Sequence, residues 1–139
     1  MVKVRSFQGY LANQANADKI ISPPYDVLNT EEAKEMAKGN DMCFLRVSKP
    51  EIDLPEGTNL YSNDVYSKGR ENLEEFMNKG YVVEDTEERM YIYMQKMGDR
   101  EQYGIVAMAS VDDYEQGKIK RHELTIRKKE EDRTRLSDT

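Results

Sequence analysis

Apolar residues recur at helical intervals in the middle of the chain, between Ser62 and Lys79. Their spacing predicts an amphipathic helix that ends before Gly80, a natural stop. Gly69 lies on the same stripe, where it either lets another backbone come close or is simply a tolerated glycine. The apolar positions of this predicted helix are Val65, Tyr66, Leu73, Phe76 and Met77.

A shorter helix is predicted to follow Asn29. Asparagine is a favoured N-cap, and Glu32 stands three residues later, as the reciprocal hydrogen bonds of a capping box require. Gly39 is a suitable C-terminal stop. The apolar stripe between these signals consists of Ala33, Met36 and Ala37.

Strand-like runs occupy much of the remaining chain. Residues 90–97 and 103–111 flank Gly98-Asp99, which predicts a β-hairpin. Both faces of this hairpin are largely apolar, a pattern typical of strands that are covered on both sides. Shorter strands are predicted at residues 2–7, 19–21, 42–48 and 81–85, with a loop at 8–18.

These elements together predict an α+β fold, with a mainly antiparallel sheet, a central hairpin and two to three helices. The 62–79 helix is expected on one face of that sheet. The length of 139 residues suits one domain with a real core. We expect an α+β body at residues 1–117 and a charged helical segment at 118–139.

Composition and charge exclude several classes of protein. No apolar run is long enough to span a membrane, and no secretory signal follows Met1, so we expect a cytoplasmic protein. The net charge is −6, which argues against a general nucleic-acid binder. Residues 118–135 hold eight basic and four acidic residues, a local charge of +4, so the rest of the chain carries −10.

The segment 118–139 has few apolar residues, so packing alone should not hold it as a helix. Three pairs spaced i,i+4 still favour helix, namely Arg127–Glu131, Lys128–Asp132 and Glu131–Arg135. The pattern reaches Thr139 without a stop signal. We therefore expect the chain to be a fragment whose first partner is its own missing C-terminal region.

Candidate chemistry within this segment centres on His122-Glu123. Lysines and arginines flank the pair on both sides, so the Glu123 carboxylate should stay ionised and could orient or deprotonate a hydroxyl. His122, Arg127 and Lys129 are candidates to bind a substrate or its phosphate, and an arginine can do so bidentately. The alternative is a charged helix N-terminus with an incidental histidine.

A second candidate is SPPYDV at residues 22–27. Its two prolines make a stiff, extended arm that can present the phenol of Tyr25 and the carboxylate of Asp26 at a cleft edge. The alternative is a structural turn in which Asp26 bonds nearby backbone amides. With one histidine and one cysteine, and with Cys43 in a buried-looking run, no metal site is expected.

The residues resemble one family along nearly the whole chain. The strings that carry the resemblance are SPPYDV at 22–27, EEAKEMAKGN at 31–40, FLRVSKPEIDLP at 44–55, GIVAMASVDDYEQGKIKRHELT at 104–125 and KEEDR at 129–133. They are similar to the bacterial and archaeal family filed as domain of unknown function ten-fifteen. Its members are longer than this chain, which resembles their N-terminal part.

The resemblance implies an activity. Further along, family members carry an Asp-Gly-His-His-Arg segment that is similar to the nucleotide-binding box of the sulfiredoxin and ParB-type superfamily, which includes free serine kinases. His122-Glu123 resembles the pair that activates the serine hydroxyl in those kinases, which implies a catalytic role for Glu123. The box is absent here, so no cofactor is expected in this fragment, whereas ATP or ADP would serve the full-length protein.

Three hypotheses follow. The chain is part of a nucleotide-dependent small-molecule kinase, with serine as one substrate. Alternatively, it is a non-catalytic module that packs on the rest of its own chain or forms a homo-oligomer with a twin subunit. A third hypothesis, nucleic-acid binding through residues 118–135, rests on the local +4 and is opposed by the net −6.

Overall fold

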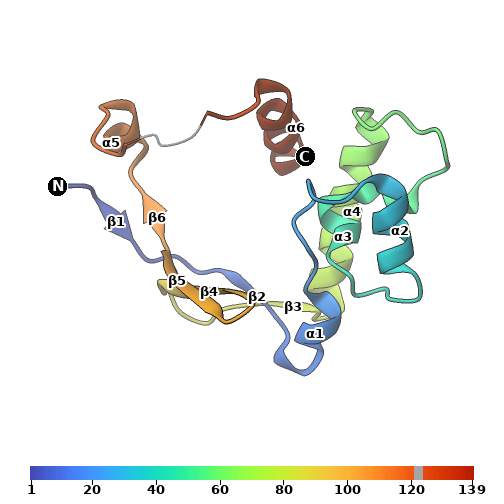
Figure 1. Cartoon of the computed structure of the whole chain (residues 1–139), viewed down its shortest axis with the longest axis horizontal. Coiled ribbons are helices and arrows are strands. Elements are labelled where there is room, and N and C mark those ends of the chain that lie inside the picture. Colours follow the sequence, from blue (N-terminus) through green and yellow to red (C-terminus); the bar gives the residue numbers. More distant parts are fainter. Residues whose placement is uncertain (121–123) are drawn as a thin grey trace. The chain divides into compact units, whose positions relative to one another are not determined.

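The structure is a computed structural model that describes residues 1–120 and 124–139. The chain forms two compact units (Figure 1). The strand unit comprises Met1–Leu11 and Glu84–Leu124, and the helical unit comprises Ala12–Val83 and Thr125–Thr139. The division expected from sequence, at residue 117, stays a prediction.

The helical unit is built around one long helix. Helix α4 (Asn63–Asn78) packs against the short helix α3 (Leu45–Ser48), the 3-10 turn η2 (Pro50–Asp53) and α6 (Arg127–Asp138). Helix α2 (Thr30–Ala37) packs on η2 and α3. The unit begins with the 3-10 turn η1 (Gln14–Asn16) and α1 (Ala17–Ile20).

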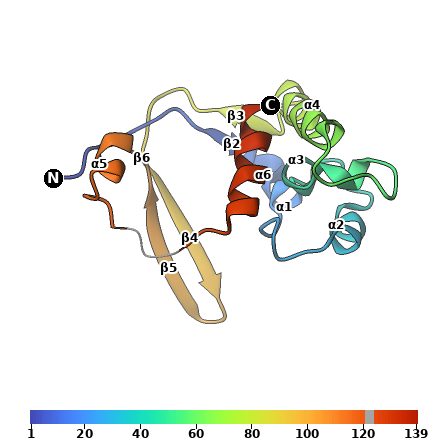
Figure 2. The ribbon, with the colours of Figure 1, turned by 90° about the horizontal axis from the view of Figure 1, so that it is seen from above.

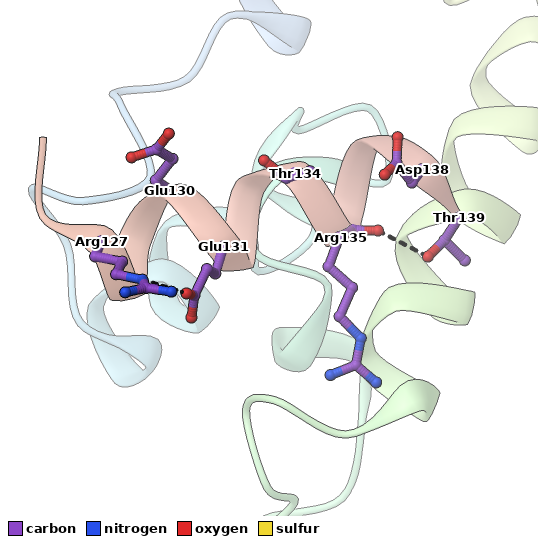
Figure 3. Close-up of a pocket in the computed structure, with 7 residues that line it drawn as sticks. All are labelled: Arg127, Glu130, Glu131, Thr134, Arg135, Asp138 and Thr139. Carbon is purple, nitrogen blue, oxygen red and sulfur yellow. Dashed lines mark hydrogen bonds and ion pairs between the residues drawn. The ribbon is translucent and has the colours of Figure 1, made fainter.

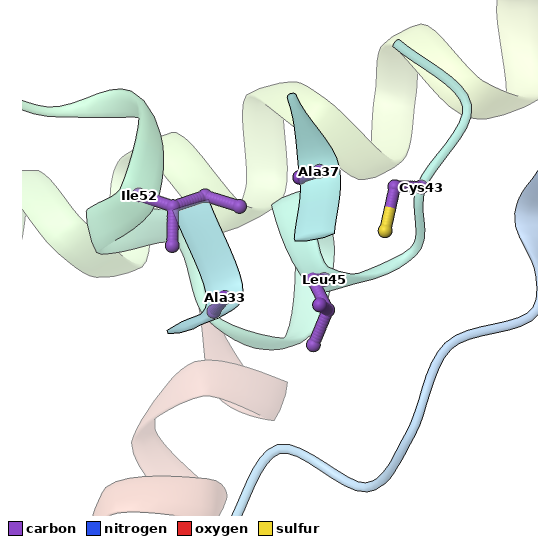
Figure 4. Close-up of a cluster of buried hydrophobic side chains, with 5 residues drawn as sticks. All are labelled: Ala33, Ala37, Cys43, Leu45 and Ile52. Carbon is purple, nitrogen blue, oxygen red and sulfur yellow. The ribbon is translucent and has the colours of Figure 1, made fainter. Parts of the chain in front are cut away.

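Two buried clusters form the core of the helical unit. The first joins α2 to α3 and η2 (Figure 4) and contains Ala33, Ala37, Cys43, Leu45 and Ile52. The second lies against α4 and contains Ile20, Val47, Phe76 and Val82. The expected burial of Cys43 is confirmed, since this free thiol is only 3% exposed.

A buried amide ties α4 to the segment before it. Asn72, 5% exposed, donates from Nδ2 to the Arg46 carbonyl at 2.7 Å and to Asp53 Oδ2 at 2.9 Å. Arg46 in turn donates to the Ala37 carbonyl at the end of α2 at 3.1 Å. Because buried polar groups are costly unless bonded, this network fixes α3 and η2 on α4.

The predicted helix boundaries are confirmed for α2 and α4. Asn29 Oδ1 accepts from the Glu32 amide at 2.9 Å, and the Glu32 carboxylate accepts from the Asn29 amide at 2.8 Å, so the capping box is complete. Gly39 and Gly80 follow the two helices with φ of 71° and 67°. Glycine adopts this left-handed geometry without the steric cost that other residues have.

The strand unit contains the predicted hairpin. Strand β4 (Tyr91–Met97) pairs antiparallel with β5 (Arg100–Val106) across Gly98-Asp99. Strand β1 (Val4–Arg5) pairs antiparallel with β6 (Met108–Ala109), and α5 (Val111–Glu115) follows. A third pair joins β2 (Tyr10–Ala12) to β3 (Val82–Glu84), the strand predicted at 81–85, and the chain passes between the units within these two strands.

The α+β class is confirmed, but several local predictions were wrong. Residues 42–48 contain helix α3 instead of a strand, and residues 19–20 belong to α1. Both runs are short and rich in apolar residues, and such a pattern does not separate a buried helix from a buried strand. The stretch 8–18, predicted as loop, contains β2, η1 and the start of α1.

The expected single sheet is also absent from the described residues, which form three two-stranded sheets. Helix α4 packs against other helical elements, as described above. The hairpin strands, expected to be covered on both sides, are exposed at every position except Tyr91.

Candidate functional site

A cleft of about 200 Å³ opens within the helical unit. Four parts of the chain line it: the segment 25–28, the junction of α3 and η2, the start of α4 with the loop before it, and the first half of α6. Its charged residues are Asp26, Lys49, Glu51, Lys129, Asp132 and Arg133. Its apolar and aromatic residues are Tyr25, Leu28, Leu60, Tyr61 and Val65.

The cleft brings together two segments that sequence singled out separately. Lys129 Nζ lies 3.7 Å from Asp26 Oδ2, and the Arg133 guanidinium lies 4.1 Å above the ring of Tyr25. Tyr25 and Asp26 therefore line the cleft, and their partner is α6. The two residues lie in a turn closed by a hydrogen bond from the Val27 amide to the Pro24 carbonyl at 3.3 Å, so this part of the segment is not an extended arm. Both contacts join residues more than 100 positions apart.

Arg133 is held in place from three sides. Besides stacking on Tyr25, it donates from Nη1 to the Ser48 carbonyl at 2.9 Å and from Nε to Asp132 Oδ2 at 2.9 Å. The other oxygen of Asp132 accepts from the hydroxyl of Tyr66 at 2.8 Å. Burial raises the pKa of Tyr66, and the bond to the Asp132 carboxylate raises it further.

A third ion pair completes the charge pattern. Lys49 Nζ lies 2.9 Å from Glu51 Oε1, and both side chains are largely buried, at 13% and 9% exposure. Each of the three cations that line the cleft thus stands beside a carboxylate. The lining is therefore electroneutral but strongly polar, an environment that suits a molecule carrying both signs of charge better than a bare polyanion.

Helix α6 reaches the cleft without a buried apolar face. None of its residues is buried, as its composition predicted. Two further cations lie over tyrosine rings: Lys128 is 4.5 Å from the centre of Tyr61, and Arg135 is 4.4 Å from that of Tyr66. Cation–π contacts of this kind are worth about 0.5–1 kcal/mol at exposed sites and more when desolvated. Together with the hydrogen bonds of Asp132 and Arg133, they compensate for the lack of a buried apolar face on this helix.

Gly69 provides the close approach between α4 and α6. A Cβ added at Gly69 would lie 2.8 Å from Leu136 Cδ1 and 3.0 Å from Pro50 Cγ. A side chain at this position would therefore require Leu136 to shift, which favours glycine here. A backbone group also lies near, as one interpretation of the sequence suggested: the Val47 carbonyl oxygen would be 3.5 Å from the added Cβ.

A second pocket, of about 650 Å³, is lined by the opposite face of α6 and by Thr139, which follows that helix (Figure 3). Arg127 lies there, with its Nε 2.8 Å from Glu131 Oε1, which confirms the first predicted i,i+4 pair. Arg127 therefore does not join Lys129 in the cleft. Asp132 and Arg135, predicted to form the other two pairs, bond instead to Tyr66 and to the Tyr61 carbonyl.

The predicted catalytic pair, His122-Glu123, lies outside the described residues. Among the residues that the structure does describe, no group of three or more potential metal ligands occurs. Over the same part of the chain, no helix combines the length and the apolar character needed to cross a membrane.

Comparison with known proteins decides the family. A family model described as "Protein of unknown function (DUF1015)" matches residues 4–139. The chain belongs to this family. Neither the curated proteins nor the solved structures gave a match.

Sequence reasoning identified three of the eleven residues that line the cleft and missed the other eight, which include Lys49, Glu51, Tyr61, Asp132 and Arg133. A signal for four of these five was present. Of the strings that carry the DUF1015 resemblance, SPPYDV, FLRVSKPEIDLP and KEEDR each supply charged residues to this one cleft. That these three segments lie close together could have been proposed from the sequence, although the distances between their side chains could not.

Proposed function

We propose that this chain is the substrate-binding part of a nucleotide-dependent small-molecule kinase, and that the cleft of the helical unit holds a small zwitterion such as free serine. The observation that carries the proposal is the meeting of Tyr25 and Asp26 with Lys129 and Arg133 in one cleft. Both segments belong to the strings by which the chain resembles its family.

The charges of the cleft support this class of substrate. A free amino acid carries a carboxylate, which a lysine or arginine would bind, and an ammonium group, which Asp26 or Glu51 would bind. The volume of about 200 Å³ lies below the usual range for drug-sized ligands, roughly 300–1,000 Å³, and therefore favours a small molecule. The tyrosine rings and Leu28 would exclude water from its apolar parts.

In the proposed reaction, the substrate hydroxyl attacks the terminal phosphorus of ATP or ADP. Glu123 accepts the hydroxyl proton as the new O–P bond forms, and the bond to the departing nucleotide breaks. The cations around the cleft bind the substrate carboxylate and position the hydroxyl. Nucleotide binding by an Asp-Gly-His-His-Arg segment would need residues outside these 139, because the sequence contains no such segment.

Titration calorimetry with L-serine tests substrate binding directly. We expect binding by the unaltered chain, and at least tenfold weaker binding by Asp26→Asn and by Lys129→Gln, because each loses one charged partner of a zwitterion. Asp138→Asn, on the outer face of α6, is the matched control and should bind as the parent does. Ethanolamine and glycerate, which each lack one of the two charges, should bind weakly.

Activity provides a separate test of Glu123. A full-length protein that includes the nucleotide-binding segment is incubated with free serine and either ATP or ADP, and phosphoserine is measured beside its Glu123→Gln variant. We expect the substitution to lower the rate about 100-fold or more, the usual contribution of a general base. Unchanged phosphoserine production would remove Glu123 from the mechanism.

A further inference from the structure

The β4–β5 hairpin (Figure 2) carries an apolar face whose side chains are exposed. Directly paired residues of an antiparallel ladder point to the same side of the sheet. One side therefore carries the pairs Ile92–Ile105, Met94–Tyr103 and Lys96–Glu101 in order toward the turn. We call this set of six residues the apolar face of the hairpin.

Four of these six residues are large, apolar and open to solvent. Ile92 is 79% exposed, Ile105 77%, Tyr103 64% and Met94 47%. Single exposed apolar residues are ordinary, but a contiguous patch of several hundred Å² usually marks an interaction site. A two-stranded hairpin is also only marginally stable in water until a third layer or strand covers it.

The charged residues of this face stand at one end only. Lys96 and Glu101 form a cross-strand ion pair at 3.6 Å beside the turn, and the Tyr103 hydroxyl donates to Glu101 at 3.0 Å. The cation is on β4 and the carboxylate is on β5 at the same height along the strands. Two copies of the face can therefore place opposite charges against each other when β4 of one copy lies over β5 of the other.

We propose that the apolar face binds the same face of a second copy of this chain, about a twofold axis that runs parallel to the strands. That axis exchanges β4 with β5 and leaves the height along the strands unchanged. It therefore places Lys96 opposite the partner's Glu101, and Ile92 opposite the partner's Ile105. Two sheets stacked in this way correspond to the aligned packing of β-sandwiches.

The other possible twofold axis in the plane of the face does not bring opposite charges together. An axis across the strands would place the Lys96–Glu101 end of one copy over the isoleucines of the other, which would bury charge against apolar surface. Charge complementarity thus selects both the occupant and its orientation. The face is small beside a standard interface of about 800 Å² per partner, so the dimer should depend on concentration.

Sedimentation velocity over a range of protein concentrations tests the dimer. The parent chain should shift from monomer to dimer as concentration rises, and Ile105→Asp should stay monomeric at concentrations at least tenfold higher. Met97→Asp is the matched control, because Met97 is 81% exposed on the same hairpin but points to the other side. It should dimerise as the parent does, and circular dichroism should show both variants folded.

A mixing experiment tests the axis without disturbing the apolar residues. Lys96→Glu gives a face with two negative charges and Glu101→Lys gives one with two positive charges, so each alone should dimerise roughly tenfold more weakly than the parent. Mixed together they should form a heterodimer, which native mass spectrometry would detect. A parent chain that stays monomeric at every concentration, an unaffected Ile105→Asp dimer, or mixing without heterodimer preference would overturn the proposal.

Discussion

Replacing Tyr66 by phenylalanine should loosen α6 while leaving the rest of the helical unit intact. The substitution removes one atom, the hydroxyl oxygen, which lies 2.8 Å from Asp132 Oδ1. The ring of Tyr66 is 2% exposed and stays in place beneath the Arg135 guanidinium. The change is therefore confined to the contacts of that hydroxyl, which bonds Asp132 and also interacts with Arg135, both on α6.

The size of the effect follows from the surroundings of that bond. Hydrogen bonds to ionised acceptors contribute about 1.5–3 kcal/mol to stability. The lower end applies here, because Asp132 keeps its bonds from Arg133 and is not left without a donor. A loss of about 1.5 kcal/mol corresponds to a roughly tenfold change in the equilibrium between docked and undocked α6.

Amide hydrogen exchange resolves this local opening. Protection of the amides of α6 should fall about tenfold in Tyr66→Phe, while protection of the α2 amides stays unchanged. Tyr61→Phe is the control: that tyrosine is 43% exposed, and the variant keeps its ring under Lys128. Protection of α6 within twofold of the parent would refute the view that polar contacts hold this helix.

Three further predictions concern single residues. The Lys118 ammonium and then the Lys3 backbone amide hold the pKa of Asp113 below its usual value. Asp113 therefore adds stability above pH 3.8, and this stability is lost as the pH falls through the lowered pKa. Asp113→Asn should flatten the acid unfolding curve of the strand unit, and an unchanged curve would contradict this. Asn29→Ala should cost about 1 kcal/mol in urea unfolding, and a loss below ~0.3 kcal/mol would deny the capping box a role. Gly69→Ala should displace Leu136 and so speed amide hydrogen exchange in α6. The amides of α4 should exchange no faster, because alanine adds roughly 1 kcal/mol of helix propensity. Unchanged protection of the α6 amides would rule out the close approach.

Local signals in the sequence account for part of the fold. The capping box at Asn29, the stop at Gly80 and the turn at Gly98 each act over a few residues, so α2, α4 and the hairpin are found where they were predicted. The run 42–48 was wrongly assigned as a strand because its burial comes from contacts with distant parts of the chain. Leu45 and Val47 are both buried in the structure, but a short apolar run is compatible with either a buried strand or a buried helix.

The candidate site was predictable only as separate parts. The chemistry of Tyr25, Asp26 and Lys129 was visible in the residue types, whereas the extended arm expected from the prolines at 22–27 is a turn at Tyr25 and Asp26. Their meeting depends on α6 docking through cation–π contacts, which leave no periodic signature in the sequence. Lys49 and Glu51 were overlooked because a neighbouring lysine and glutamate usually form an ordinary surface pair, whereas here both are largely buried.

Titration of the isotope-labelled chain with L-serine, followed by nuclear magnetic resonance, shows whether the cleft binds serine, because it reports both binding and its location. We expect saturable shifts in the amides of Tyr25, Asp26, Lys49 and Lys129, whereas the amides of Thr134 and Asp138 on the opposite face of α6 should not move. No shifts at saturating serine, or shifts centred on that opposite face of α6, would contradict the proposed serine site.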